Sequence, residues 1–332
     1  MKRKINIKDV AKYAGVSPAT VSRVLNNYPH IRPEKRKLVE NAIQFLEFKP
    51  DEIARSLITK KTNTIGLIVD DISNPFFSEA SKIVINQARK LGYEILIYDL
   101  SGDIDVEQSL IFLKNRNISG LLVGSASMEE EKFNHLKDSG IPVVYFNRRP
   151  LITEFDTVTM DNELASDLAV NHLVSKGHSN IVFISGPIQF STYFDRLKGF
   201  KSAYTKSGAS DFEKNILTGA FNEEDIFLFI NELFSTDNTP TAVIGASDQI
   251  AITILSAISS LKLEVPKDVA VVGFDNISIS KNPYIGLTTI SQQKIKMLSK
   301  ALSMLIERIE GNDSENPKHL LISPILIERR TT

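Results

Sequence analysis

Apolar residues recur at helical spacing near the start of the chain, and the pattern breaks at a glycine. The first run has an apolar face formed by Ile7, Val10, Ala11 and Ala14. Asn6 precedes this run with Asp9 three residues later, which is the spacing of a helix N-terminal cap. Gly15 stands where the helix should stop. The pattern therefore predicts a short helix between Asn6 and Gly15, followed by a tight turn.

A second short helix follows the turn. Ser17 is placed to cap it, and Pro18 occupies its first position, where proline is favoured. Its inward face consists of Val21, Val24 and Leu25, and its outward face of Pro18, Ala19, Ser22, Arg23 and Asn26. A helix that lies deep in the DNA major groove needs such short side chains with one long cation. The two helices therefore predict a DNA-binding helix-turn-helix. An ordinary helical hairpin is the alternative, but caps, turn glycine and exposed face all agree with DNA binding.

The same spacing predicts a third helix, which Pro33 and Glu34 open. Its apolar stripe consists of Leu38, Val39, Ala42, Ile43 and Leu46. The three helices form a headpiece over residues 1–49. Residues 50–62 (PDEIARSLITKKT) connect this headpiece to the rest of the chain. Their apolar residues fit a helix of two turns, which is marginal in water, so we expect this segment to be helical only when it is docked.

From Thr64 onward, short apolar strands alternate with amphipathic helices, first to about residue 160 and again over about residues 180–276. This alternation predicts two parallel sheets with helices on both faces, and hence two lobes of similar build. Polar residues follow the strands where each strand ends: Asp70, Asn74, Asn147, Asp248 and Asp275. Ligands of such sheets bind at the carboxyl edge of the strands, so we expect a binding crevice there.

Composition and charge add to this picture. The 332 residues include no cysteine, which excludes disulfides and thiolate metal sites. We find no signal peptide and no apolar run long enough to span a membrane, and therefore expect a cytoplasmic protein. Residues 1–62 hold 14 Lys/Arg and 6 Asp/Glu, a net charge of +8, whereas the remaining 270 hold 25 and 34, a net charge of −9. A basic arm on an acidic body is expected when only one end meets phosphates.

Motifs of several enzyme classes are missing. The sequence has no G-x-G-x-x-G, Walker loop, H-E-x-x-H or G-x-S-x-G. The histidines, which lack metal-ligand spacing, are His30, His135, His172, His178 and His319. We therefore expect no catalytic activity, no metal and no cofactor.

The segment IKDVAKYAGVSPATVSRVLN closely resembles the DNA-binding headpiece of the LacI/GalR family of bacterial transcription regulators. The resemblance continues in one order through nearly the whole chain. The matching segments are ARSL (54–57), TNTIGLIV (62–69), ISNPFF (72–77), KGH (176–178), RLKGF (196–200), VAVVGFDN (269–276), LTTI (287–290) and LIERR (326–330). Agreement spread over this length is much more specific than any single motif.

The resemblance implies an all-α helix-turn-helix headpiece plus an α/β core of two doubly wound lobes of the periplasmic-binding-protein type. It assigns residues 50–62 to a hinge helix and residues 63–332 to an effector-binding and dimerisation core. The lobe limits that it implies are about 63–161 plus 292–320 for the N-lobe and about 162–291 plus 321–332 for the C-lobe. The expected partners are a second copy of the chain and a pseudo-palindromic DNA operator.

For DNA, the resemblance assigns base reading to the start of the second helix. Pro18 and Ala19 can offer only apolar contact, so Ser22 and Arg23 are the candidates for polar readout. We expect phosphate contacts from Asn6, Ser17, Thr20, Asn26 and His30. For Thr20, a hydroxyl that stabilises its own helix is the alternative.

Two further features of the DNA-binding part come from the resemblance. Ala54 and Leu57 belong to the hinge motif, and in the family a leucine matching Leu57 wedges into the minor groove and kinks the operator. A plain linker is the alternative. Arg32 replaces the Ser or Thr with which relatives cap the third helix, which weakens that cap or adds a phosphate contact.

For the effector, the resemblance assigns the strongest contacts to Arg196 and Asp275, a pair that can hold vicinal hydroxyls or a carboxylate. The expected hydroxyl partners are Asn74, Asn147 and Asp248. The expected stacking walls are Phe77, Phe190 and Phe221, for which core packing is the alternative. Phe190 stands where the purine-sensing relative has arginine, which favours a sugar over a purine. The chain departs from family habit at Asn147, usually Asp, and Gln293, usually Pro.

Together with these patterns, the resemblance implies a dimeric repressor of carbohydrate-utilisation genes, controlled by a sugar or sugar derivative in the cleft between the core lobes. Several relatives sense a phosphorylated carrier protein instead, and the sequence does not exclude such a partner. A cytoplasmic solute-binding protein is another alternative, which the basic headpiece disfavours. A carbohydrate-active enzyme would need a catalytic pair or cofactor loop that we do not find. The chain ends without a heptad tail, so we expect a dimer and not a tetramer.

Overall fold

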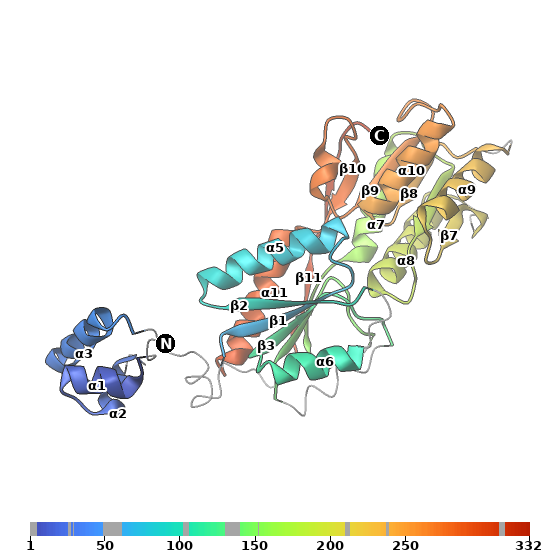
Figure 1. The fold of residues 1–332 in the computed structure, drawn as a ribbon. Coiled ribbons are helices and arrows are strands. Elements are labelled where there is room, and N and C mark those ends of the chain that lie inside the picture. The colour runs from blue at the N-terminus through green and yellow to red at the C-terminus, as the bar shows by residue number, and fades with distance from the viewer. Residues whose placement is uncertain are drawn as a thin grey trace. The chain divides into compact units, whose positions relative to one another are not determined.

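The computed structural model divides the chain into two compact units, residues 1–62 and residues 63–332 (Figure 1). It describes residues 5–25, 28, 30–48, 62–101, 106–129, 140–151, 153–209, 213–236, 239–311 and 316–332. The predicted hinge helix and three predicted DNA contacts, Asn26, Ala54 and Leu57, lie outside these residues.

Three helices form the described part of the first unit. They are α1 (Ile7–Ala14), α2 (Pro18–Leu25) and α3 (Pro33–Phe45). Their small core consists of Val10, Ala11, Ala14, Val21, Val24, Val39 and Ala42. These are the apolar positions that the helical spacing of the sequence singles out, so local pattern and packing agree in this unit.

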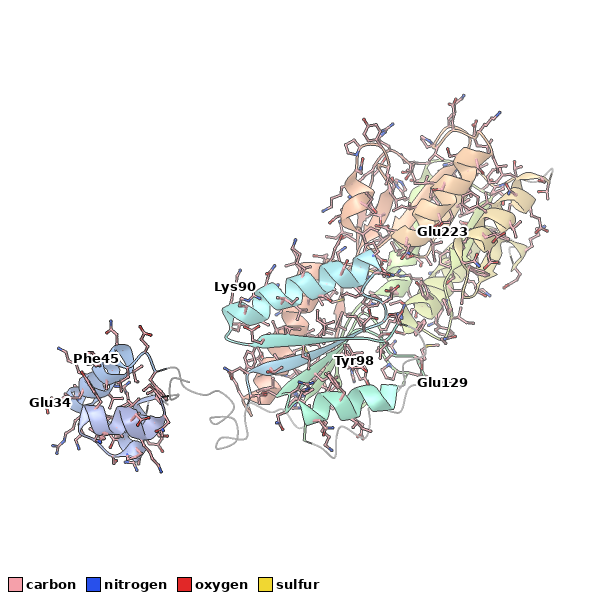
Figure 2. All side chains as sticks on the ribbon, viewed as in Figure 1. Glu34, Phe45, Lys90, Tyr98, Glu129 and Glu223 are labelled. Carbon is pink, nitrogen blue, oxygen red and sulfur yellow. The ribbon has the colours of Figure 1, made fainter. Side chains whose placement is uncertain are left out.

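Among the described residues of this unit, five large apolar side chains are exposed: Ile5, Tyr13, Tyr28, Leu38 and Phe45. Leu38 was predicted to face the core, but it is 51% exposed because the buried face of α3 is centred on Val39 and Ala42 and Leu38 falls at its edge. Tyr13 and Phe45 stack with their ring centroids 4.8 Å apart, and the labelled Phe45 stands out from α3 (Figure 2).

The N-lobe of the second unit is a six-stranded parallel sheet. In spatial order its strands are β11 (His319–Ile322), β5 (Asp156–Met160), β4 (Val143–Phe146), β3 (Gly120–Val123), β1 (Thr64–Val69) and β2 (Glu94–Asp99). Helices α5 (Pro75–Lys90) and α11 (Lys294–Ile309) cover one face and α6 (Val106–Asn115) the other (Figure 1). Strands buried on both faces explain why these segments are continuous apolar runs.

The C-lobe repeats this architecture, and only its last strand is antiparallel. In spatial order its strands are β12 (Ile325–Ile327), β10 (Thr288–Ser291), β9 (Ala270–Phe274), β8 (Ala242–Gly245), β6 (Ile181–Ser185) and β7 (Ile216–Thr218). Helices α7 (Asn162–Ser175) and α8 (Ser191–Lys206) pack on one face, and α9 (Glu223–Phe234) and α10 (Asp248–Ser260) on the other. The predicted class, two doubly wound lobes, is therefore confirmed.

Three segments connect the lobes. They lie between β5 and α7, between β10 and α11, and between β11 and β12. The third lies at residues 323–324, slightly later than the expected 320, because Leu321 and Ile322 still pair with β5 in the N-lobe sheet. In each sheet the strand order reverses beside the first strand of the lobe, β1 or β6, and the carboxyl ends of strands at such a point form a ligand crevice.

None of the helices in the described ranges is long and apolar enough to cross a bilayer.

Candidate functional site

The helix-turn-helix has the caps that its sequence predicts. The Asn6 side chain accepts hydrogen bonds from two backbone N–H groups at 2.9 and 3.3 Å, and the Asp9 carboxylate accepts one from the Asn6 N–H at 2.9 Å. Gly15 ends α1 with a φ of 65°, a left-handed conformation that favours glycine. Ser17 opens α2 by accepting a hydrogen bond from the Thr20 N–H at 3.1 Å. The caps fix where each helix starts and stops, and so fix which face of α2 points outward.

The outward face of α2 consists of the side chains that were predicted to read DNA. Pro18, Ala19 and Arg23 are exposed and Ser22 is half-buried. On the opposite face, Val21 and Val24 are 0% and 5% exposed. The helix can therefore approach a groove closely and still present a hydroxyl and a guanidinium to base edges.

Several predicted phosphate contacts have local roles. Asn6 and Ser17 are helix caps. The Thr20 hydroxyl lies 2.9 Å from the Ser17 hydroxyl, a contact that agrees with the alternative in which Thr20 stabilises its own helix. His30 is exposed. Arg32 makes no side-chain cap hydrogen bond to α3, so the departure from Ser or Thr leaves that cap unfilled.

A polar cavity lies between the two lobes of the second unit. Both lobes and a crossing segment line it, with Asn74, Phe76, Phe77, Asn147, Arg148, Thr192, Tyr193, Arg196, Ser247, Asp275 and Gln292. Five of these residues were predicted from the sequence to bind an effector: Asn74, Phe77, Asn147, Arg196 and Asp275. The volume of the cavity that is open to the centre of a water-sized molecule is only about 20 Å³. A larger ligand therefore requires the side chains or the lobes to move.

Arg196 is the most constrained side chain of this cavity. It is 2% exposed, and its guanidinium donates to Asn162 Oδ1 at 2.9 Å, to the Ala246 carbonyl oxygen and to Asp275 Oδ1 at 3.2 Å. Its charge also lies 4.7 Å from the centroid of the Phe274 ring. The arginine therefore joins the start of α7 to the segments that follow β8 and β9 of the C-lobe, and it orients the Asp275 carboxylate.

The local sequence explains how α8 delivers Arg196 so deeply. Gly199 follows one turn later, and a Cβ on it would lie 2.5 Å from the Glu163 carbonyl oxygen of α7. The glycine thus lets the two helices approach closely. Ser166 of α7 then donates a hydrogen bond to the Arg196 carbonyl oxygen at 2.7 Å. This close packing places Arg196 at the floor of the crevice.

Strained backbone and unpartnered atoms mark the same cavity. Asn147 and Asp275 have φ values of 63° and 105°, which non-glycine residues rarely adopt and which often occur at functional sites. Three buried side-chain atoms there have no hydrogen-bond partner among the described residues: Asn147 Oδ1, Arg148 Nε and Gln292 Oε1. Buried polar atoms are normally paired, so these two acceptors and one donor are positioned for a ligand or for water.

Three residues predicted for the effector site do not line the cavity. Phe190 is half-buried, and its ring face is covered by the Arg148 guanidinium at 3.8 Å from the centroid. Phe221 packs against the α9 and α10 side of the C-lobe, beside Gly219. Asp248 points back into its own lobe and is 0% exposed. A position after a strand shows which edge a residue occupies but not which way its side chain turns.

Asp248 instead ties the C-lobe loops together. Its carboxylate accepts hydrogen bonds from the Ile277 N–H at 2.9 Å, from the Ser280 hydroxyl at 2.6 Å and from the Thr289 hydroxyl. Burial, with the charge of Asp275 adding to it, raises the pKa of Asp248 to about 7.

We expect the raised pKa to make the core less stable as pH rises. Between pH 5 and 8 the native state releases a proton from Asp248 that the unfolded chain has already lost, so the free energy of unfolding should fall by about 1–3 kcal/mol. Asp248→Asn keeps an acceptor oxygen and removes this titration. Chemical unfolding at four pH values tests the point: the variant should lack the decline, and an equal decline in both proteins would contradict the assignment.

Sequence reasoning missed two important residues of the cavity, Arg148 and Gln292. Arg148 Nη1 pairs with Asp70 Oδ2 at 2.7 Å, and Gln292 Nε2 donates to Asp275 Oδ1 at 2.6 Å. The sequence position of each residue could have indicated that it lies at the crevice. Arg148 directly follows Asn147 at a strand end, and Gln292 lies beside the expected crossing near residue 291.

Contacts of α5 and α11 with residues 275–278 join the two lobes. Glu79 of α5 accepts a hydrogen bond from the Ser278 N–H at 2.6 Å and pairs with Lys294 at 3.0 Å. Lys294 also donates to the carbonyl oxygens of Asp275 and Asn276, each at 2.9 Å. Burial acts to raise the pKa of Glu79, but the Ser278 N–H and the Lys294 ammonium outweigh it and lower that pKa. The N-lobe thus holds the loop that carries Asp275.

The departure from family habit at Gln293 has a structural counterpart. Gln293 precedes α11 with a φ of 48°, whereas a proline ring fixes φ near −65°. A proline could not adopt this backbone. The glutamine side chain donates to the Ser323 carbonyl oxygen at 2.6 Å, and so joins two of the crossing segments.

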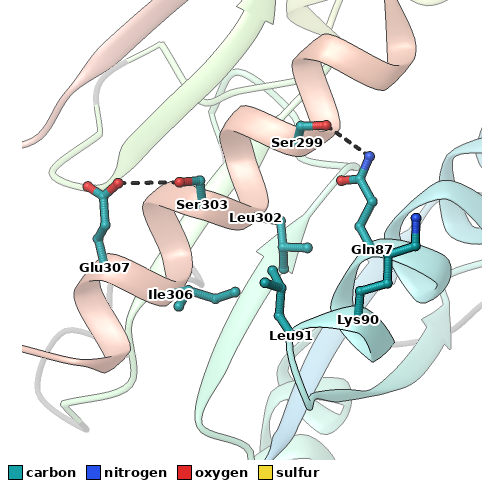
Figure 3. A pocket seen from close by; sticks show the side chains of 8 residues that line it. All are labelled: Gln87, Lys90, Leu91, Ser299, Leu302, Ser303, Ile306 and Glu307. Carbon is teal, nitrogen blue, oxygen red and sulfur yellow. Dashed lines mark hydrogen bonds between the residues drawn. The ribbon is translucent and has the colours of Figure 1, made fainter.

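A second hollow, of about 400 Å³, lies between α5 and α11 on the N-lobe (Figure 3). Its lining consists of Gln87, Lys90, Leu91, Ser299, Leu302, Ser303, Ile306 and Glu307. Four of its polar side chains pair with one another, Gln87 with Ser299 at 2.8 Å and Ser303 with Glu307 at 3.3 Å. It lacks the convergent, unpartnered polar atoms of the cavity between the lobes.

Two family models match the chain. The model of bacterial regulatory proteins of the lacI family covers residues 6–51, and that of a periplasmic binding protein-like domain covers residues 170–332. Catabolite control protein A of Priestia megaterium is 32% identical over 303 residues, which are 91% of each chain. The HTH-type transcriptional repressor PurR of Mannheimia succiniciproducens is 32% identical over 327 residues, 98% of each chain.

Solved structures agree with these matches. The lac repressor dimer bound to operator and the anti-inducer ONPF has a TM-score of 0.85 at 25% identity over 99% of both chains. The complex of the transcriptional regulator CelR with cellobiose has a TM-score of 0.75 at 26% identity, over 99% of this chain and 100% of that one. The relatives named here are transcription regulators and not enzymes.

Proposed function

Because this chain belongs to the LacI family of bacterial regulatory proteins, we propose that it represses carbohydrate-utilisation genes under the control of a sugar or sugar derivative. At the family level it is a DNA-binding transcriptional repressor with an effector-binding core. The sugar is our proposal. The observation that carries it is the group of unpartnered buried polar atoms at the crevice between the lobes.

The chemistry of this crevice supports a sugar. Asn147, Arg148 and Gln292 leave two acceptors and one donor unpaired, and a ring with several hydroxyl groups can satisfy both kinds of atom. Aromatic side chains from both lobes, such as Phe77 and Tyr193, provide apolar walls beside these polar atoms. A solved relative, CelR, is a complex with cellobiose, which fits the same class of ligand.

We propose that the effector acts by changing how the two lobes meet. Its binding would require the cavity to widen, and the contacts of Glu79 with Ser278 and of Lys294 with Asp275 and Asn276 would respond because they join the lobes. A shift of the N-lobe would be felt by residues 50–62, which we propose to be the hinge helix, and then by the operator. Such coupling is reciprocal, so operator DNA must change effector affinity by the same factor.

The operator is proposed to be pseudo-palindromic and the protein a homodimer, each headpiece reading one half-site. The lac repressor was solved as a dimer on its operator, which supports this arrangement. Since a repressor works where the chromosome is, we place the protein in the cytoplasm.

The proposed hinge leads to a prediction at Leu57. If Leu57 wedges into the minor groove, Leu57→Ala should weaken operator binding by about tenfold or more, because a wedge exchanges base stacking for contact surface. The affinity of the core for its effector should not change. Fluorescence anisotropy with labelled operator checks the first point and calorimetry the second; an unchanged operator affinity would remove Leu57 from the interface.

Thermal unfolding of the purified chain tests the effector proposal. The panel contains sugars, sugar phosphates, sugar acids and nucleobases; the nucleobases are included because several relatives are named PurR. A ligand at about 100 times its dissociation constant should stabilise the core by roughly 2.7 kcal/mol. Stabilisation by a sugar or sugar derivative supports the proposal. Stabilisation by a nucleobase alone, or by no compound, would overturn it, and the second result would favour a phosphorylated carrier protein as the signal.

A further inference from the structure

Arg148 holds an unusual position at the crevice because a carboxylate already neutralises it. It follows β4 and is 6% exposed. Its Nη1 lies 2.7 Å from Asp70 Oδ2 and 3.3 Å from Ser125 Oγ, and the Ser125 hydroxyl in turn donates to Asp70 Oδ1 at 2.9 Å. Asp70, Ser125 and Arg148 therefore form a closed set of contacts at the ends of three N-lobe strands.

The other side of the Arg148 guanidinium faces the C-lobe. It lies 3.8 Å from the centroid of the Phe190 ring and 5.8 Å from that of Tyr193. The arginine therefore takes the aromatic face that a ligand ring would otherwise use. Its Nε remains buried and has no partner in the part of the chain that the structure describes. The same side chain thus packs across the crevice and keeps one donor for a ligand.

The charges around the cavity balance. Each lining arginine has its own carboxylate, Arg148 with Asp70 and Arg196 with Asp275 at 3.2 Å. The next titratable group inward is Asp248, which is another carboxyl. Among the described lining residues, no cation is left to meet an anionic ligand. Burying a phosphate or carboxylate beside Asp275 would therefore be unfavourable.

The atoms that do lack partners suit a neutral ligand. Two of them, Asn147 Oδ1 and Gln292 Oε1, are acceptors and need O–H or N–H donors, and the third, Arg148 Nε, is a donor. The oxygens of an ionised phosphate or carboxylate accept hydrogen bonds but do not donate them, so an anionic group placed against either acceptor would leave that acceptor unpaired. A hydroxyl group can donate to either acceptor and accept from Arg148.

We infer that the effector is an uncharged polyhydroxylated compound, that is, a sugar without phosphate or carboxylate, and that Asp70 sets this preference by neutralising Arg148. This inference rests on the proposed function and narrows it. Asp70 acts through Arg148 and so is a positioning residue for ligand selectivity.

Calorimetry on the full chain with matched sugars tests the inference. Each set contains a neutral sugar, its 6-phosphate and its uronic acid, for example glucose, glucose 6-phosphate and glucuronate. In the wild-type protein the neutral member of the binding set should bind at least about tenfold more tightly than either anionic member, since an anion meets no free cation. Asp70→Asn leaves Arg148 uncompensated and should shift the ratio of affinities at least about tenfold toward the anionic members.

Asp71→Asn is the matched control, because it removes the same charge one residue away. The Asp71 carboxylate accepts from the Ser73 N–H at 2.7 Å, a bond that asparagine can keep. The control should retain the neutral preference, and an equal shift in both variants would overturn the role of Asp70. A wild-type preference for the phosphate or acid would overturn the inference but leave a sugar effector standing. Binding of no member in any set would overturn the proposed function itself.

Discussion

Replacing Arg196 with methionine should lower the melting temperature of the core by about 6 °C or more, which corresponds to about 3 kcal/mol for a unit of this size. The arginine donates to Asn162, to the Ala246 carbonyl oxygen and to Asp275 from a position that is 2% exposed. Methionine fills similar volume but donates no hydrogen bond. The Asp275 carboxylate would then lose its ion pair while still largely buried, and calorimetric scanning measures the result.

A double variant separates the effect of the uncompensated Asp275 charge from the effect of the other contacts that Arg196 loses. Asp275→Asn added to Arg196→Met removes the uncompensated charge, so the double variant should regain about 1 kcal/mol or more relative to the single one. Both variants should lose the response to the effector, because Asp275 and Arg196 line the cavity. A single variant as stable as the wild type, or one that still responds to the effector, would contradict the role given to Arg196.

Replacing Arg23 with alanine should weaken binding to the selected operator by about tenfold to a hundredfold. Arg23 is the cation on the outward face of α2, where it stands beside Ser22 and is exposed. If it reads a base edge, the loss should be concentrated at one position of each half-site. If it contacts only a phosphate, the loss of affinity should be similar for every DNA sequence. The slope of the logarithm of the binding constant against the logarithm of salt concentration should then fall in magnitude by about one.

Lys37→Ala is the control for this variant. Lys37 is also an exposed cation of the headpiece, but it lies on α3 and not on the outward face of α2. Its replacement should lower affinity slightly and without regard to sequence. An Arg23 variant that binds its operator as the wild type does would remove Arg23 from the interface.

The headpiece could be predicted in detail because its determinants are local. Asn6, Asp9 and Gly15 act within a few residues of themselves, and the structure has the capping box and the left-handed turn that their spacing indicates. Leu38 departs from this agreement, since the edge of a helical stripe depends on how α3 meets its neighbours. The local sequence determines where an apolar stripe lies on a helix, whereas packing against neighbouring helices determines how wide its buried part is.

The crevice could be predicted only in outline. Strand-end positions and the family resemblance pointed to Arg196 and Asp275, and both line one cavity. They placed Asp248 there too, although its side chain turns back toward Ser280 and Thr289. Both orientations are compatible with the end of a parallel strand, so spacing alone could not separate them.

Arg148 shows why the other contacts of the crevice could not be predicted from the sequence. Its partners are Asp70, 78 residues earlier, and Phe190, in the other lobe. Neither pairing has a signature in the sequence around Arg148, and the family resemblance stated no role for this position. The charge balance of the cavity follows from these long-range contacts and becomes visible only once the lobes are assembled.

We propose that this chain couples the binding of a DNA operator to the binding of a small ligand in its core. The most direct measurement is anisotropy of a duplex selected by the full chain from a random pool, titrated with protein in the absence and presence of the sugar that stabilises the core. We predict that the selected duplex is pseudo-palindromic and that the sugar changes the dissociation constant by about fivefold or more, as expected for a coupled regulator. Selection of no preferred sequence, or a dissociation constant that the bound sugar leaves unchanged, would contradict this account.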